Sequence, residues 1–163
     1  MAEKRNPINE TDDEARALAR RLIDEARTGA LAVLHPDTGA PFVSRVAVGT
    51  DADGAPVTLI SALAVHTRAL RSDTRAALLL GDPGLKGDPL THPRITLSVT
   101  AQFLDPADPD REALRARWLE THPKSQLYVD FPDFAFVRLQ VWGAALNGGF
   151  GKAYELTPAE LMP

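Results

Sequence analysis

The sequence predicts a mainly β protein of the α+β class, an antiparallel barrel or sheet with helices at its periphery. Two observations favour this class. One helical pattern is followed by three strand patterns joined by hairpin turns, and then by strands that short helical segments interrupt. This order differs from the regular strand–helix alternation of a parallel α/β sheet. The length of 163 residues suits a single domain, which we expect over residues 11–163, after a flexible N-terminus of residues 1–10.

The first helix is expected to begin at Thr11, because Thr11-x-x-Glu14 has the pattern of a capping box. Apolar residues at helical spacing give this helix one buried face: Ala15, Leu18, Ala19, Leu22, Ile23 and Ala26. Gly29 is expected to end the helix. Three strands follow, separated by proline, glycine and aspartate: strands at residues 30–35, 42–50 and 57–61, turns at residues 36–41 and 51–54.

The second half of the chain mixes short helices with longer strands. Asp108 is predicted to cap a helix that has Pro109 in its first turn and that Pro123 ends after His122. The other expected elements are a helix at residues 66–72, a strand at 76–80, a loop at 81–93, a strand at 94–103, a short helix at 125–131, strands at 134–146 and 152–156 around a turn at 147–149, and a helix start at Thr157.

The composition excludes several classes of function. With 44% hydrophobic and 25% charged residues, the chain has the composition of a globular protein. Its net charge of −4 argues against a nucleic-acid-binding protein with a broad basic face. The absence of cysteine excludes disulfides, zinc–thiolate sites and a cysteine nucleophile. The sequence has neither an apolar run near the ~20 residues of a membrane span nor a signal-peptide pattern, so a cytoplasmic protein without membrane contact is expected.

The familiar catalytic and metal-binding motifs are missing. The four histidines are some thirty residues apart, so none forms the short pairs typical of zinc or iron sites. There is no Gly-x-Ser-x-Gly elbow and no Walker loop. We therefore predict no metal site, and the sequence identifies no catalytic residue.

One group of residues could bind an anion. Arg45 lies in an apolar strand, where an unpaired guanidinium would be costly. His66-Thr67-Arg68 begins a short helix, whose free N–H groups favour an anion, and Ser61 ends the strand before it. If these residues converge, they can hold a phosphate through charge-assisted hydrogen bonds. The alternative is equally supported by the spacing: Arg45 pairs with an acidic neighbour, while Arg68 and Arg71 are solvated.

Two further features have both a structural and a functional interpretation. Trp118 has helical spacing with Leu114 and is interpreted as a core residue rather than a stacking platform. The glycines of residues 147–151 suit a tight turn with positive φ, and they would also let the backbone approach a flat ring.

An ordered set of motifs resembles the FMN-binding split barrels related to pyridoxamine 5′-phosphate oxidase, and is most similar to their haem-utilisation branch. The set covers roughly residues 12–156 and consists of residues 42–46, 61–70, 73–80, 87–90, 94–97, His122-Pro123 with Tyr128, residues 131–134 and residues 148–153. The resemblance implies a six-stranded antiparallel split barrel that forms a homodimer and binds FMN in a groove at the dimer interface. It implies these cofactor-binding residues: Arg45, Ser61, His66, Thr67, Arg68, Trp142, Gly149 and Phe150.

The resemblance implies an FMN-binding flavoprotein, an oxidoreductase whose small-molecule substrate the sequence does not identify. The flavin would supply the chemistry, while the protein binds and orients it. Two other functions stay open: a haem-binding or haem-degrading protein on the same fold, and a non-catalytic FMN carrier or sensor.

Overall fold

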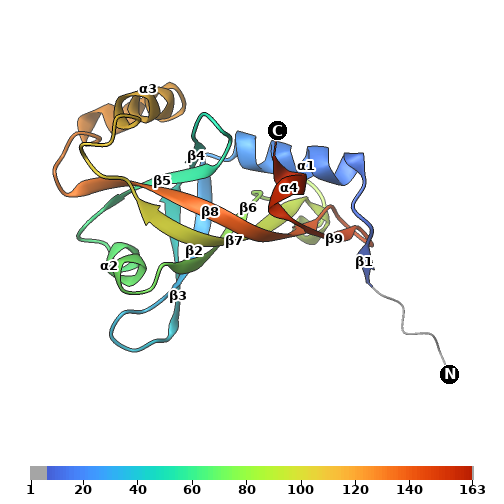
Figure 1. The fold of residues 1–163 in the computed structure, drawn as a ribbon. Coiled ribbons are helices and arrows are strands. Elements are labelled where there is room, and N and C mark those ends of the chain that lie inside the picture. Colours follow the sequence, from blue (N-terminus) through green and yellow to red (C-terminus); the bar gives the residue numbers. More distant parts are fainter. Residues whose placement is uncertain (1–6, 163) are drawn as a thin grey trace.

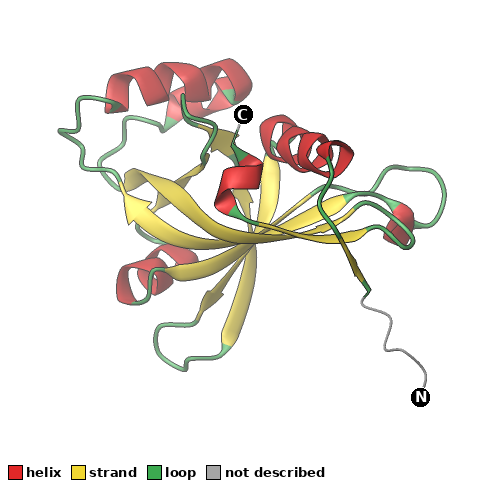
Figure 2. Cartoon of the chain, turned by 45° about the vertical axis from the view of Figure 1, so that its right-hand side comes forward, coloured by secondary structure: helices red, strands yellow, loops and turns green. Residues whose placement is uncertain are grey.

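The computed structural model describes residues 7–162, and in this part of the chain nine strands form one sheet (Figures 1 and 2). The strand order is β1-β9-β8-β7-β6-β2-β3, and β5 pairs with both β4 and β8. The strands are β1 (Ile8–Asn9), β2 (Thr28–Leu34), β3 (Pro41–Ala47), β4 (Gly49–Thr50), β5 (Pro56–Ser61), β6 (Arg75–Leu80), β7 (Arg94–Phe103), β8 (Phe134–Asn147) and β9 (Ala153–Leu156). The helices are α1 (Asp13–Glu25), α2 (Val65–Ser72), α3 (Arg111–Thr121) and α4 (Pro158–Leu161), with 3₁₀ turns η1 (Pro89–Thr91) and η2 (Pro123–Leu127).

The α+β class and the peripheral helices are confirmed, whereas the number of six strands is not. The sheet is open and has nine strands. One cause is Val48, which divides the strand predicted over residues 42–50: its N–H donates to the carbonyl of Arg27 instead of continuing a ladder. As a result β3 pairs with β2, while β4 pairs with β5. The short strand β1, which lies within the predicted flexible N-terminus, runs parallel to β9.

Two helix starts differ from the sequence prediction by two residues. Asp12 caps α1 by accepting from the N–H of Ala15 at 2.8 Å, while the hydroxyl of Thr11 donates to the carbonyl of Glu155. Helix α3 begins after Asp110, because the Asp108 carboxylate closes a turn onto the Asp110 N–H. Helix α1 ends at Glu25, and Gly29 lies within β2 rather than at the helix end.

Two hydrophobic clusters stabilise the sheet from different sides. The larger cluster packs α1, through Ala15, Ala19 and Ile23, against buried residues of β2, β6, β7 and β8. In the smaller cluster, Trp118 of α3 packs edge-on against Phe136 of β8. Trp118 is therefore a core residue, as predicted. Within the described residues, no helix is long and apolar enough to cross a membrane.

A β-bulge changes the direction of side chains along β8. Ser98 of β7 pairs with Gly143, and the next residue, Val99, pairs with Val141, so Trp142 is the extra residue. The inward-facing positions therefore change from odd to even numbers: Leu139 is buried before the bulge, and Leu146 is buried after it. Trp142 is left 61% exposed at the bulge.

The start of α2 is fixed by hydrogen bonds around Ser61, the last residue of β5. The buried hydroxyl of Thr67 donates to the Ser61 carbonyl at 2.6 Å. The Ser61 hydroxyl donates to the carboxylate of Asp133 at 3.1 Å and accepts from the N–H of Leu63. The N–H of Ala62 donates to the carbonyl of Asp133 at 2.7 Å. This Ser61 junction, consisting of Ser61, Thr67 and Asp133, joins β5, α2 and the segment before β8.

We predict that Thr67→Val lowers the free energy of unfolding by about 1 kcal/mol, because one buried hydrogen bond is lost without a change of shape. Thr58→Val is the matched control, since Thr58 is also buried and its hydroxyl donates to the carbonyl of Ala47 at 2.8 Å. Chemical denaturation should give similar losses for both variants. Hydrogen exchange should be faster at the start of α2 in Thr67→Val alone; equal exchange there in both variants would contradict the role of the Ser61 junction.

Candidate functional site

The structure brings some of the predicted anion-binding residues together at the start of α2. The hydroxyl of Ser44 on β3 lies 2.8 Å from Nδ1 of His66 in the first turn of α2. Helix α2 begins after Ala64, which has no side chain to cap the first N–H groups. Ser61 and Thr67 lie behind this helix start, where their polar groups already bind each other and Asp133. Thr67 and Ser61 therefore position α2, and their hydroxyls are engaged within the protein.

Arg45 is exposed, so the cost expected for an unpaired guanidinium in an apolar strand does not arise. Successive side chains of a strand point to opposite faces, and Ser44 points to His66, so Arg45 points to the other face of β3. It lines a cavity of about 360 Å³ together with Ala30, Leu79 and Gly81. Within the described residues it has no ion-pair partner. Its guanidinium can therefore bind an anion. Because the side chain is exposed to water, it does not need an anion for stability.

Arg68 and Arg71, the other two cations of α2, have different surroundings. Arg68 lies 3.7 Å from the carboxylate of Asp37 in the turn between β2 and β3, and both side chains are exposed. Such an exposed pair contributes little stability, so Arg68 can exchange Asp37 for another anion. The guanidinium of Arg71 lies 4.1 Å from the centre of the Phe103 ring, away from this group.

Burial lowers the pKa of His66 from its ordinary value of 6.5. The imidazole is therefore neutral at pH 7, and the positive charge near the start of α2 comes from arginine alone. Because β3 is the last strand in the sheet order, its edge can be reached from both faces. We call the residues around this edge the edge cradle: Ser44, Arg45, His66 and Arg68.

Trp142, Gly149 and Phe150 do not join the edge cradle within one chain. Strand β5 lies between β3 and β8, because it contacts β3 and pairs with β8. Ser61 pairs with Phe134, and Trp142 lies eight residues further along β8, roughly 26 Å away. Gly149 has a φ of 119°, as expected for a tight turn, and Phe150 is exposed. The predicted cofactor-binding residues thus form two separate groups.

One face of the sheet, made mostly of small side chains, lies between these two groups. Directly paired residues of an antiparallel sheet lie on the same face, and the pairs from β3 to β8 define one face whose side chains are half-buried or exposed. We call it the outer face: Arg45, Val43, Ala30, Ala32, Leu79, Ala77, Thr96, Ser98, Ala145 and Gly143. Most of these side chains are small, so a planar molecule can lie close to the backbone. Val43, Leu79 and Trp142 at the bulge add large exposed apolar groups.

Sequence reasoning missed Asp133 and most of the outer face. Asp133 reaches Ser61 across 72 positions of sequence, and no local pattern predicts that pair. The outer face did leave a signal, because small residues alternate with buried ones at Ala30, Leu31, Ala32 and Val33 of β2. This alternation predicts a strand, and its small residues also mark one face of that strand.

The histidines do not provide an iron ligand on the outer face. His35 lies against Phe42, His66 against Ser44 and His122 on Trp118, and His92 is held within the loop between β6 and β7. No group of three or more His, Asp or Glu side chains that could hold a metal ion occurs within residues 7–162. The outer face and the edge cradle therefore fit a flat anionic ring, while any iron in it would have no histidine from this face.

Comparison with known proteins finds chains of similar sequence and structures of similar fold. The non-canonical heme oxygenase HOZ of Arabidopsis thaliana chloroplasts is 39% identical over 103 residues, which are 63% of this chain and 30% of that protein. A heme-binding protein from Mycobacterium smegmatis is 30% identical, with a TM-score of 0.82 over 93% of this chain and 61% of that one. The chain thus spans less than two thirds of the length of both proteins.

A third similarity concerns the fold alone. A Clostridium acetobutylicum protein related to general stress protein 26, of the pyridoxinephosphate oxidase family, has a TM-score of 0.68 at 14% identity, over 93% of this chain and 99% of that one. The split-barrel fold implied by the ordered motifs is thereby confirmed. The model of one family, described as "CREG, beta-barrel", matches residues 10–162. The chain therefore belongs to the CREG β-barrel family.

Proposed function

We propose that this chain binds haem against the outer face of its sheet, with a carboxylate of the haem at the edge cradle. The observation that carries this proposal is the outer face itself, a floor of small side chains that ends at the unpaired guanidinium of Arg45. The names of the two relatives favour haem over other flat anionic rings, because one is a heme oxygenase and the other a heme-binding protein.

The residues of this chain would bind and orient the ring. Ala30, Ala32 and Ala77 leave room for a planar group, and Val43 and Leu79 offer apolar contacts beside it. Arg45 can form a bidentate, charge-assisted bond with a carboxylate. Haem, when bound, would supply an iron at which oxygen chemistry can occur, and no histidine of this chain lies on the outer face to bind that iron.

FMN is the second candidate, and the edge cradle favours it. A phosphate at the edge of β3 would meet Arg45 from one side, and Arg68 and the uncapped start of α2 from the other. The isoalloxazine needs no iron ligand, which agrees with the absence of histidine from the outer face. In this case the chain would be a flavoprotein, either an oxidoreductase or a carrier, with the flavin supplying the redox chemistry.

We also propose that two copies pair through their outer faces. Val43, Leu79 and Trp142 are 61%, 42% and 61% exposed, and soluble proteins rarely leave such a patch to water. In a symmetric pair the same face is used twice, so Trp142 and Phe150 of one copy could approach the edge cradle of the other. This arrangement would unite the two groups of predicted cofactor-binding residues, which one chain keeps apart.

We predict that Leu79→Lys converts a dimer into a monomer, because a charge would be buried in the paired outer faces. Light scattering should give the wild-type protein twice the chain mass of 17.6 kDa and the variant the chain mass. Leu85→Lys is the matched control, since Leu85 is fully exposed in the loop between β6 and β7. A monomeric wild type, or a variant as dimeric as this control, would contradict pairing through this face.

We predict that the purified protein shifts the Soret band of added haem and that this shift saturates as haem is titrated. Arg45→Ala should weaken haem binding by roughly tenfold, because one charge-assisted bond is lost. Arg21→Ala, at an exposed position of α1, removes the same charge elsewhere. An unchanged Soret band would rule out haem, and equal affinities of the two variants would rule out Arg45 as an anion ligand.

We predict that, if FMN is the cofactor, Arg68→Ala weakens FMN by roughly 10- to 150-fold and leaves riboflavin, which has the same ring without phosphate, almost unaffected. Flavin fluorescence measures both affinities. A ratio of FMN to riboflavin affinity that stays at the wild-type value would show that Arg68 does not contact the phosphate.

A further inference from the structure

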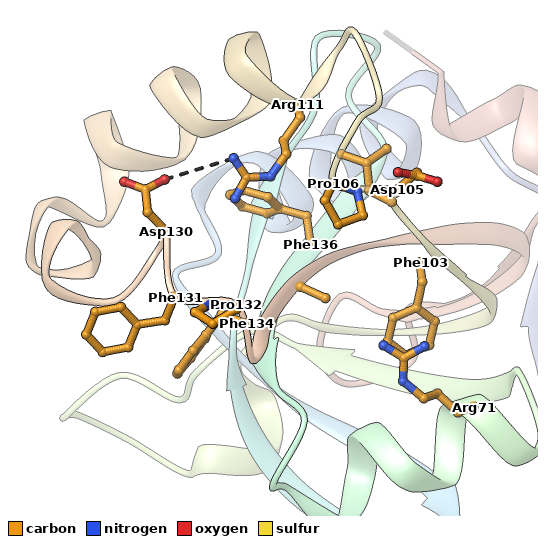
Figure 3. Close-up of a pocket in the computed structure, with 12 residues that line it drawn as sticks. Arg71, Phe103, Asp105, Pro106, Arg111, Asp130, Phe131, Pro132, Phe134 and Phe136 are labelled. Carbon is orange, nitrogen blue, oxygen red and sulfur yellow. Dashed lines mark ion pairs between the residues drawn. The ribbon is translucent and has the colours of Figure 1, made fainter.

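A separate cavity of about 430 Å³ lies beyond the C-terminal end of α2 (Figure 3). Its walls come from the end of α2, the end of β7, the start of α3 and the segment that leads into β8. It shares no lining residue with the outer face or the edge cradle. A volume of this size is typical of sites for small organic molecules.

Phenylalanine side chains form the apolar part of the cavity wall, beside its charged residues. Phe103 lies at one side, beside Arg71, and Phe131 and Phe134 lie at the opposite side (Figure 3). Phe136 is almost completely buried, whereas Phe131 is 53% exposed. The core does not require an exposed phenyl ring at this place, and aromatic rings placed around a cavity offer both faces and edges to another ring.

The walls are held in place by contacts that do not depend on a ligand. Phe136 packs edge-on against Trp118 in the smaller core cluster. The segment with Phe131 is fixed by the Ser61 junction, because the N–H of Ala62 binds the carbonyl of Asp133. Pro106 and Pro132 stiffen two further parts of the wall. The cavity is therefore preformed, which reduces the entropic cost of binding.

Arg71 and Arg111 line the cavity together with the carboxylates of Asp105 and Asp130. With Arg115, which binds Asp130, three guanidiniums face two carboxylates, so the group has a net charge of +1. Arg71 is stacked on Phe103 and, within residues 7–162, has no carboxylate within ion-pair distance. Arg111 is 3.9 Å from the carboxylate of Asp130. That carboxylate is already bound by Arg115 through two hydrogen bonds of 2.6 and 2.8 Å, and the Arg115 guanidinium lowers the pKa of Asp130. Asp130 is therefore committed to Arg115, and Arg71 and Arg111 can bind another anion.

From these observations we infer a second ligand site, which takes a small planar aromatic molecule with one carboxylate. The ring stacks among Phe103, Phe131 and Phe134, and the carboxylate binds Arg71, which has no ion-pair partner within residues 7–162. The site is independent of the cofactor that the outer face binds, so it can be tested whether or not haem or FMN binds.

The test uses 2-naphthoate as the probe and 2-naphthamide, its uncharged isostere, as the matched ligand. Both are titrated into the ¹⁵N-labelled protein, and amide chemical shifts report affinity and position. We expect 2-naphthoate to bind in the millimolar range or tighter, as roughly expected for a ligand of this size, with the largest shifts around Phe103 and Phe131. The amide should bind about tenfold more weakly, because it lacks the charge.

Two pairs of variants test separately how much the arginine charge and the phenylalanine ring contribute to binding of 2-naphthoate. Arg71→Gln should lose about tenfold in affinity for 2-naphthoate, whereas Arg21→Gln, which removes an exposed cation from α1, should lose none. Phe131→Ala should also weaken binding, with Leu85→Ala as the control at another exposed apolar side chain. Equal affinity for 2-naphthoate and 2-naphthamide, equal effects of Arg71→Gln and Arg21→Gln, or shifts located elsewhere would overturn the site.

Discussion

The carbonyl and hydroxyl of Ser61 are the point from which both candidate sites are positioned. The carbonyl accepts the buried hydroxyl of Thr67, and the hydroxyl donates to Asp133. The first bond fixes where α2 begins, and therefore where His66 and Arg68 lie relative to β3. The second bond fixes the segment before β8, which forms one wall of the phenylalanine-lined cavity. The Thr67 hydroxyl is buried and therefore needs its partner, and these bonds leave the fold little freedom to place the two segments elsewhere.

The second constraint is the difference between the two faces of the sheet. Leu31 and Leu97 face the larger core cluster and are fully buried, whereas Ala32 and Ser98 face outward from the same strands. A sheet face in contact only with water is usually polar, and this face is instead small and apolar. The bulge at Trp142 extends it by leaving a large ring at its border. These features account for a surface that can receive a flat ring and a second copy of the chain.

Local sequence patterns predicted most helices and strands, because residue periodicity within a short segment is enough to distinguish the two. The alternation of residues 94–103 gave the bounds of β7 correctly, and the helix at residues 66–72 differs from α2 by one residue. Contacts between distant residues were beyond such patterns. The division of the predicted strand at Val48 depends on a hydrogen bond with Arg27. The hydrogen bond of the Thr67 hydroxyl to the Ser61 carbonyl depends on where β5 ends. Arg45 was expected to need an anionic partner because its strand is apolar, yet both Arg45 and the apolar residue Val43 are exposed.

We propose that the outer face binds the cofactor. The chain's two tryptophans allow a direct measurement of where added haem binds. Trp142 is exposed at the border of this face, and Trp118 is buried in the smaller core cluster. With both tryptophans labelled as 5-fluorotryptophan, ¹⁹F NMR gives one resonance for each. Addition of ferric haem should broaden the Trp142 resonance and leave the Trp118 resonance sharp. Broadening of Trp118 with an unchanged Trp142 would contradict the account, because haem would then bind on the side of α3.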